Sequence, residues 1–280
     1  MNDVQRVILN LFKEFDRICT QYNIPYYAIG GTCIGAIRHK GFIPWDDDMD
    51  VAIPIEFFGK FISVAKEELP PYYKIFSSSD IQHYRYLFIK LIDTRTTFIE
   101  ELEYEYKDSY KGIFLDIMPI SGIPNNPINK RMFIVKQHYY YLMNNTVRYP
   151  IDYIFKGNTN KKAIWKCVYL FSKITGPQKF NYYTDKWMTY LKKYPFYNSK
   201  TTGYVWSSRL SKLIFRTDDF GKPIRVAFED CSIYCPSNYD NYLKTQFGDY
   251  MKLPPEEKQV CAHPGIVDTK TSYMNYIEAL

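Results

Sequence analysis

The chain of 280 residues (33.4 kDa) is long enough to bury a large core as one domain, or as one domain with an insertion. Its hydrophobic content of 46% and charged content of 24% are ordinary for a soluble globular protein, and no apolar run approaches the length of a membrane span. The net charge of +6 suits an anionic partner such as a nucleotide, a nucleic acid or an acidic membrane surface, although a modest excess of solvated Lys explains it equally well.

The first part of the chain predicts alternating helices and strands. Apolar residues at helical spacing predict a helix from residue 4 to about residue 22, followed by a short buried strand over 25–29. Gly30-Gly31 breaks this strand, and Thr32 is a candidate N-cap for a short helix over 33–39. We then expect a strand over 48–54, a helix over 56–69, and strands over 72–76, 85–92, 97–101 and 112–119.

After residue 124 the sequence becomes aromatic and basic. Its periodicity predicts long helices over 129–148, 160–175 and 178–194. Candidate strands over 226–228 and 232–234 follow, and a helix over 239–247 ends at a glycine. The basic, Trp-bearing segment 161–171 fits either core packing or contact with a membrane surface.

Four carboxylates stand within five residues, from Asp46 to Asp50, and run straight into an apolar segment. If 48–54 is a strand, Asp46, Asp48 and Asp50 share one face and Asp47 points to the other. Like charges on a half-buried strand repel one another unless a cation lies between them, and a hard divalent cation such as Mg²⁺ suits oxygen ligands. The structural alternative is an Asp-rich turn that caps a helix or binds Ca²⁺ loosely.

The surrounding sequence favours phosphate chemistry near these carboxylates. Gly30-Gly31 lets backbone amides approach a phosphate, and a helix starting at Thr32 adds favourable partial charge. Asp116 lies in another predicted strand, where it can complete a metal site or accept a proton. Its alternative role is a core Asp satisfied by backbone donors.

Several cations are candidates for binding an anion in the same pocket. Arg38, His39 and Lys40 precede the acidic run, with a solvated loop as the alternative. Lys90 stands inside an apolar strand, where an unpaired charge is costly, so we expect it to face a carboxylate or a substrate phosphate. His263 lies in a Pro-containing tail, and we expect it at the surface.

The motifs together resemble the LicD family of phosphocholine and phospho-polyol transferases, to which fukutin-related protein is a distant relative. The resemblance rests on Gly30-Gly31-Thr32, on residues 35–50 (GAIRHKGFIPWDDDMD), on residues 114–119 (FLDIMP) and on the tail over 236–254. It covers the chain nearly end to end and is weakest over 126–216. The departures, Cys33-Ile34 and Phe247, involve no candidate metal ligand.

The resemblance implies a nucleotidyltransferase-like α/β (α+β) fold, a mixed sheet flanked by helices, with a helical and aromatic C-terminal half. It also implies transfer of phosphocholine or a phospho-polyol from a CDP-linked donor to a sugar hydroxyl of a cell-surface glycan precursor, such as a teichoic acid or polysaccharide, with release of CMP. By this resemblance Asp48 and Asp50 bind Mg²⁺ or Mn²⁺, Asp46 is a further candidate ligand, and Asp116 is a metal ligand or general base. The residues expected to bind the donor and its phosphates are Gly30, Gly31, Thr32, Arg38, His39 and Lys90.

We expect one LicD-like domain over 1–280. It comprises a metal- and phosphate-binding core over 1–125, a helical segment over 126–216 as candidate acceptor-binding region, and a segment over 217–280 that packs back on the core. Two alternatives stay open: a nucleotidyltransferase that uses an NTP, and a non-catalytic protein that binds a CDP-alcohol.

The expected partners are a CDP-alcohol and a glycan, which a lipid carrier can hold, and no nucleic acid, because the basic residues form no continuous stripe. The N-terminus lacks a secretion-signal pattern and the six Cys are scattered, so we expect a cytoplasmic protein with free thiols. Peripheral contact with the inner face of the membrane is compatible with this location.

Overall fold

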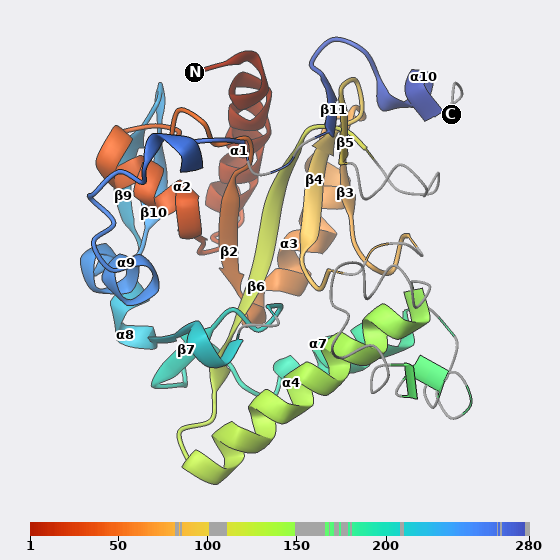
Figure 1. Cartoon of the computed structure of the whole chain (residues 1–280), viewed down its shortest axis with the longest axis vertical. Helices are drawn as coiled ribbons and strands as arrows, with labels where there is room; N and C mark the ends of the chain where they lie inside the picture. Colours follow the sequence, from red (N-terminus) through yellow and green to blue (C-terminus); the bar gives the residue numbers. More distant parts are fainter. Residues whose placement is uncertain are drawn as a thin grey trace.

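A mixed sheet runs through the centre of the computed structural model (Figure 1). Its strands lie in the order β1 (Tyr27–Ala28), β2 (Asp50–Pro54), β6 (Phe114–Ile123), β4 (Ile89–Asp93) and β3 (Tyr73–Phe76). β2 and β6 are parallel, whereas the pairs β1–β2, β6–β4 and β4–β3 are antiparallel. The far end of β6 also pairs with β7 (Thr201–Gly203), which pairs with β8 (Ile214–Arg216).

The structure describes most of the chain, with gaps. The described residues are 1–81, 84, 86–100, 111–148, 166–167, 169–170, 174, 179, 181–207, 210–261, 263 and 265–277. The predicted helix over 160–175 and the basic segment over 161–171 lie largely outside them.

Two amphipathic helices pack against the sheet and bury its apolar residues. α1 (Asp3–Gln21) begins with a capping box, in which the Asn2 side chain accepts from the Gln5 amide at 2.8 Å and the Gln5 side chain accepts from the Asn2 amide at 3.0 Å. α3 (Ile55–Glu68) follows β2 directly. Both helices contact β6, and they contact each other. These helices confirm the predictions over 4–22 and 56–69.

The connection between β1 and β2 differs from the prediction. α2 (Gly30–Ile34) already starts at the glycine pair, with Ile29 at the N-cap, and a π-helical turn (Gly35–His39) continues it. The prediction that Thr32 caps a helix starting at residue 33 is therefore wrong. Thr32 lies inside α2, where its hydroxyl accepts a hydrogen bond of 2.8 Å from the Asp50 amide.

The predicted helix over 129–148 is present as α4 (Pro127–Arg148), and the described part of the predicted helix over 178–194 contains α7 (Tyr182–Leu191). The two helices pack together, and the Trp187 indole donates to the Gln137 side chain. Within the described residues, no helix combines the length and apolarity needed to cross a bilayer.

The C-terminal part returns to the sheet by a series of short elements: α8 (Thr217–Phe220), β9 (Ile224–Phe228), β10 (Cys231–Cys235), α9 (Tyr239–Phe247), a 3₁₀ turn (Glu256–Lys258), β11 (Gly265–Asp268) and α10 (Tyr273–Ile277). β9 and β10 form a hairpin that contacts β1, which confirms the strands predicted over 226–228 and 232–234. α9 confirms the helix over 239–247. β11 pairs with β5 (Thr97–Glu100), so a strand from the C-terminal part lies beside a strand from the first half of the chain (Figure 1).

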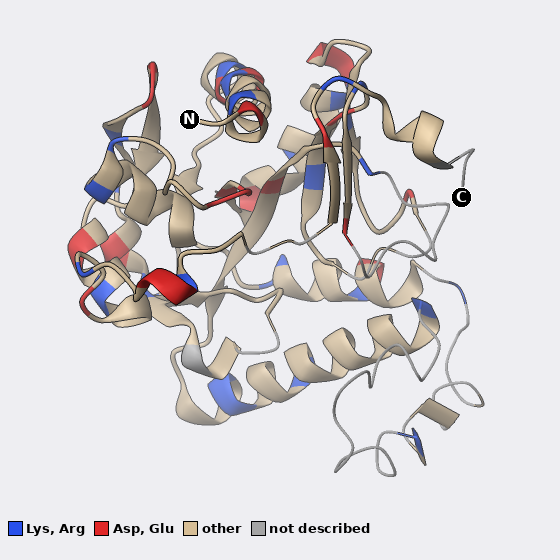
Figure 2. Cartoon of the chain, turned by 45° about the horizontal axis from the view of Figure 1, so that its top comes forward, with Lys and Arg blue, Asp and Glu red and all other residues tan. Residues whose placement is uncertain are grey.

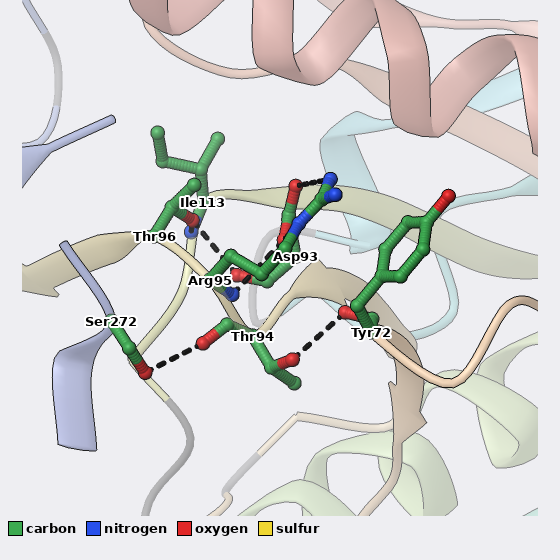
Figure 3. Close-up of polar contacts among 7 residues, drawn as sticks. All are labelled: Tyr72, Asp93, Thr94, Arg95, Thr96, Ile113 and Ser272. Carbon is green, nitrogen blue, oxygen red and sulfur yellow. Dashed lines mark hydrogen bonds and ion pairs between the residues drawn. The ribbon is translucent and has the colours of Figure 1, made fainter. Parts of the chain in front are cut away.

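Side-chain hydrogen bonds fix the turn between β4 and β5 and attach the C-terminal segment to it (Figure 3). The Ser272 hydroxyl donates to the Thr94 carbonyl at 2.7 Å, and the Thr94 hydroxyl donates to the Tyr72 carbonyl at 2.9 Å. Within the turn, Arg95 forms an ion pair of 2.7 Å with Asp93. This attachment holds β11 beside the turn, and with it His263, which lies two residues before β11.

Candidate active site

Three ionisable residues form one row across the centre of the sheet. In the strand register, Asp50 of β2 lies opposite Asp116 of β6, and Asp116 lies opposite Lys90 of β4. Residues paired directly across neighbouring strands point to the same face, so the three side chains meet there. The Lys90 ammonium lies 3.0 Å from an Asp116 carboxylate oxygen, and the two side chains are only 12% and 10% exposed. Lys90 therefore faces an anion, as predicted.

The row forms the floor of a cavity of about 370 Å³. Met118 of β6 stands two residues from Asp116 and reaches this cavity by strand alternation, and Phe88, in the bend just before β4, also lines it. The complete lining consists of Asp48, Asp50, Tyr86, Phe88, Lys90, Glu100, Asp116, Met118, Tyr141, Trp206, Ser207 and His263. The cavity thus combines a charged floor with an aromatic wall.

The segment before β2 carries the other carboxylates. β2 begins at Asp50, two residues later than predicted, so Asp46, Asp47 and Asp48 do not alternate as in a strand. Each of the three offers a carboxylate oxygen within 4.8 Å of the others. The prediction that Asp47 points away from its neighbours is therefore wrong. We refer to Asp46, Asp48, Asp50 and Asp116 as the carboxylate cluster.

Burial and mutual repulsion raise the pKa values in the carboxylate cluster. Burial, followed by the charge of Asp48, raises the pKa of Asp46 to about 8. Burial and the charges of Asp48, Asp116 and Asp46 raise the pKa of Asp50 well above its ordinary range. Burial also raises the pKa of Asp116 to about 6, against the opposing effect of the Lys90 cation. One Lys does not compensate this concentration of negative charge, so the cluster favours an added cation.

The glycine pair leaves room for the carboxylates. Gly30 has a φ of +56°, and a Cβ there would lie 3.5 Å from an Asp50 carboxylate oxygen. A Cβ on Gly31 would lie 3.0 Å from an Asp46 carboxylate oxygen. The Gly30 amide donates to the Tyr242 hydroxyl at 2.8 Å, so the protein itself uses this amide. In this structure Gly30, Gly31 and Thr32 position the carboxylates and the start of β2.

Arg38 and His39 are not among the residues that line the cavity. The Arg38 guanidinium donates to the carbonyl oxygens of Tyr250 at 2.5 Å and Lys252 at 3.4 Å, and to the His39 ring at 2.9 Å. The His39 ring also meets Trp45 edge to face, with the ring centroids 6.4 Å apart. Arg38 therefore connects the π-helical turn to the segment after α9, and His39 packs against Trp45 in the segment before β2.

His263 lines the cavity, so the expectation of a surface residue is wrong. Its Nδ1 lies 3.1 Å from one Asp47 oxygen and 3.9 Å from an Asp48 oxygen, and its backbone amide donates to Asp47 at 3.2 Å. The hydrogen bond to Asp47 and the charge of Asp48 raise the pKa of His263 to about 9, although burial opposes this. His263 therefore supplies a second positive charge beside the carboxylates.

The sequence analysis also did not predict several other residues that line the cavity. Tyr86 and Phe88 are spaced by two residues with Lys90 in the strand predicted over 85–92, so this spacing could have identified them, although β4 begins only at Ile89. Tyr141 and Trp206 reach the cavity from α4 and from the residues after β7, and no local pattern marks them.

Comparisons with known proteins identify relatives of this chain. The sequence model of the LicD/FKTN/FKRP nucleotidyltransferase domain matches residues 23–160. The chain is 32% identical over 273 residues to the lipopolysaccharide cholinephosphotransferase LicD of Haemophilus influenzae, covering 94% of this chain and 96% of that protein. Two uncharacterised proteins, from Rickettsia prowazekii and Rickettsia typhi, are each 44% identical over 46 residues, or 16% of this chain and 17% and 15% of theirs. The length and identity of the Haemophilus match, together with the domain match, show that this chain belongs to the LicD family.

Proposed function

We propose that the protein transfers phosphocholine from a CDP-linked donor to a sugar hydroxyl of a glycan, with the help of Mg²⁺ or Mn²⁺ and with release of CMP. Membership of the LicD family makes the chain a transferase of phosphorus-containing groups. The Haemophilus relative, named a lipopolysaccharide cholinephosphotransferase, supports phosphocholine as the group and a glycan as the acceptor. The observation that carries the proposal is a single cavity with carboxylates and Lys90 on its floor and aromatic rings on its wall.

The carboxylate cluster has the chemistry of a site for a hard divalent cation. Asp48, Asp50 and Asp116 line the same cavity, and Asp46 adjoins Asp48. Oxygen donors and a surplus of negative charge suit Mg²⁺, and Mn²⁺ prefers the same ligands. When bound, such a cation would neutralise the charge on the donor phosphates as CMP leaves.

Residues of the chain itself would position the donor and accept the proton of the acceptor hydroxyl. Lys90, with its ammonium on the cavity floor, would bind an oxygen of the donor pyrophosphate while it remains close to Asp116. The acceptor hydroxyl oxygen forms a bond to the phosphorus of phosphocholine, and the bond from that phosphorus to the bridging oxygen breaks, so that CMP leaves with the electron pair. The hydroxyl proton goes to Asp116, whose pKa of about 6 suits a base near neutral pH.

The aromatic wall supports choline as the alcohol. The rings of Tyr86 and Phe88 are stacked, with centroids 4.5 Å apart, and Trp206 meets Phe88 edge to face at 5.7 Å. Glu100 lines the same cavity. A trimethylammonium group donates no conventional hydrogen bond, and it is recognised through aromatic faces and negative charge. A polyol would need polar partners instead.

A donor screen tests this proposal. The protein is incubated with choline-free lipopolysaccharide, Mg²⁺ and, separately, CDP-choline, CDP-ribitol, CDP-glycerol and CTP, with Asp50→Asn as the control. We expect CMP and a phosphocholine-bearing glycan from CDP-choline alone, detected by mass spectrometry, and no product from the control. Pyrophosphate release from CTP would instead identify a nucleotidyltransferase, and CDP-choline binding without any product would identify a binding protein.

A further inference from the structure

Helix α4 carries an apolar stripe on its exposed side. Ile128, Met132, Val135 and Tyr139 are 71%, 65%, 63% and 49% exposed, respectively. Their spacing of four, three and four residues places them within an arc of about 60° on a helix with about 3.6 residues per turn. We call these four residues the α4 stripe. Large apolar side chains that gather in this way mark an interaction surface more often than scattered ones do.

The other side of α4 is firmly packed, so the exposure of the α4 stripe does not come from a loosely attached helix. Phe133 and Gln137 are buried, and they lie on the face opposite the stripe. Phe133 stacks on Tyr190 of α7 with centroids 5.7 Å apart, and Gln137 accepts from Trp187 of the same helix. α4 therefore presents one face to the protein and the α4 stripe to the surroundings.

Positive charge accompanies the α4 stripe. The 22 residues of α4 contain no Asp or Glu, and Lys and Arg alone provide its charge (Figure 2). Arg131 and Lys136 flank the stripe on its two sides. Together with Met132, Val135 and Tyr139 they line a shallow hollow of about 540 Å³. Arg131 and Lys136 form no ion pair with any described residue. The surface thus combines apolar side chains at its centre with unneutralised cations at its edge.

We propose that the α4 stripe docks on a lipid bilayer that contains anionic headgroups. Apolar side chains would enter the acyl boundary, while Arg131 and Lys136 would extend their charged ends to the headgroups. Tyr139 has the apolar ring and polar hydroxyl that suit the interface. Charge distinguishes this occupant from a second copy of the chain, because two α4 surfaces placed together would bring cations of the same sign into contact. Docking would hold the enzyme beside an acceptor on a lipid carrier.

Vesicle flotation with the full chain tests the proposal without any need for turnover. One vesicle population contains phosphatidylglycerol and phosphatidylethanolamine, and the other contains phosphatidylcholine alone. We expect binding to the anionic vesicles, and binding that weakens as salt rises. Met132→Glu/Val135→Glu should weaken this binding at least about tenfold, because two exposed apolar side chains become charged. Arg131→Gln/Lys136→Gln should weaken it by about 30-fold, at about 1 kcal/mol for each cation near the surface.

The matched control is Val267→Glu/Met274→Glu, which makes the same two substitutions at exposed positions of β11 and α10. This variant should bind anionic vesicles as the wild type does. Absence of wild-type binding, or undiminished binding by both α4 variants, would overturn the proposal. A wild-type dimer in sedimentation velocity that Met132→Glu/Val135→Glu converts to a monomer would also overturn it, because the stripe would then bind a second copy.

Discussion

Replacing Asp50 with Asn removes one negative charge from the centre of the carboxylate cluster and nearly keeps the shape of the side chain. Asp50 lies opposite Asp116 in the sheet, and the charges of Asp48, Asp116 and Asp46 all raise its pKa. Lys90 keeps Asp116 as its ion-pair partner after the substitution. We therefore expect Asp50→Asn to stabilise the metal-free protein while it abolishes activity.

The size of the effect follows from the spacing of the strands. Neighbouring strands lie about 5 Å apart, and two unit charges at that distance repel by about 3 kcal/mol at an effective dielectric constant of about 20. Part of this repulsion is already relieved in the wild type, because the raised pKa favours protonation of Asp50. A gain of about 1–3 kcal/mol in the free energy of unfolding remains, which corresponds to a rise in Tm of roughly 2–6 °C for a chain of this size.

Thermal unfolding with and without Mg²⁺ measures this effect. Saturating Mg²⁺ should raise the Tm of the wild type, since a ligand that binds only the folded state stabilises it. The rise should be smaller in Asp50→Asn, because the stabilisation free energy from Mg²⁺ falls by about 1.4 kcal/mol for each tenfold loss of affinity. The variant is therefore the more stable protein without the metal and loses this advantage with it.

Asp47→Asn is the matched control, because the same chemical change three residues away should lower the free energy of unfolding instead of raising it. Asp47 accepts from the His263 side chain and from its backbone amide, and loss of charge-assisted hydrogen bonds should lower stability by about 1–3 kcal/mol. The reasoning fails if Asp50→Asn lowers the Tm as Asp47→Asn does. It also fails if Mg²⁺ raises the Tm of Asp50→Asn as much as that of the wild type.

Three further predictions concern the same cavity. His263→Ala removes a partner of Asp47, so steady-state kinetics should show kcat falling at least about tenfold with KM little changed. His263→Gln should recover part of this loss of kcat. An unchanged kcat in His263→Ala contradicts the positioning role of His263. Phe88→Leu should raise KM for CDP-choline at least about fivefold and leave KM for CDP-glycerol unchanged, whereas an equal rise for both donors contradicts recognition of the ammonium by the ring. The pKa is raised to about 8 in Asp46 and to about 6 in Asp116, so protons compete with the metal for these carboxylates. Calorimetry should therefore show that the affinity for Mg²⁺ rises from pH 6 to pH 8. An affinity that does not depend on pH contradicts the proposal that Asp46 and Asp116 are metal ligands.

The sequence predicted the fold wherever a periodic pattern extended over several turns or several strand residues. The helices α1, α3, α4 and α9 and the strands β9 and β10 lie where the apolar spacing placed them. The strands β7 and β8 contain only three residues each, which is too few for alternation to show, and they were missed. The described residues of the C-terminal half therefore contain β7 to β11 in addition to the helices.

The candidate site was predictable where charge conflicts with a local apolar pattern. Asp50, Asp116 and Lys90 each stand out in an apolar strand, and the strand register brings the three together. His263 could not be found in this way, because its partner Asp47 is 216 positions away and β11 must first pair with β5. Asp47 was misplaced because alternation was applied to residues before the actual start of β2.

Mg²⁺-dependent turnover of CDP-choline tests the proposed function most directly. The wild type should convert CDP-choline to CMP and add one phosphocholine group to the glycan, with both products appearing in equal amounts and disappearing on chelation of the metal. Asp50→Asn, folded and more stable without metal, should form neither product. Undiminished transfer by Asp50→Asn, or transfer that persists after chelation, would contradict a metal-assisted reaction at the carboxylate cluster.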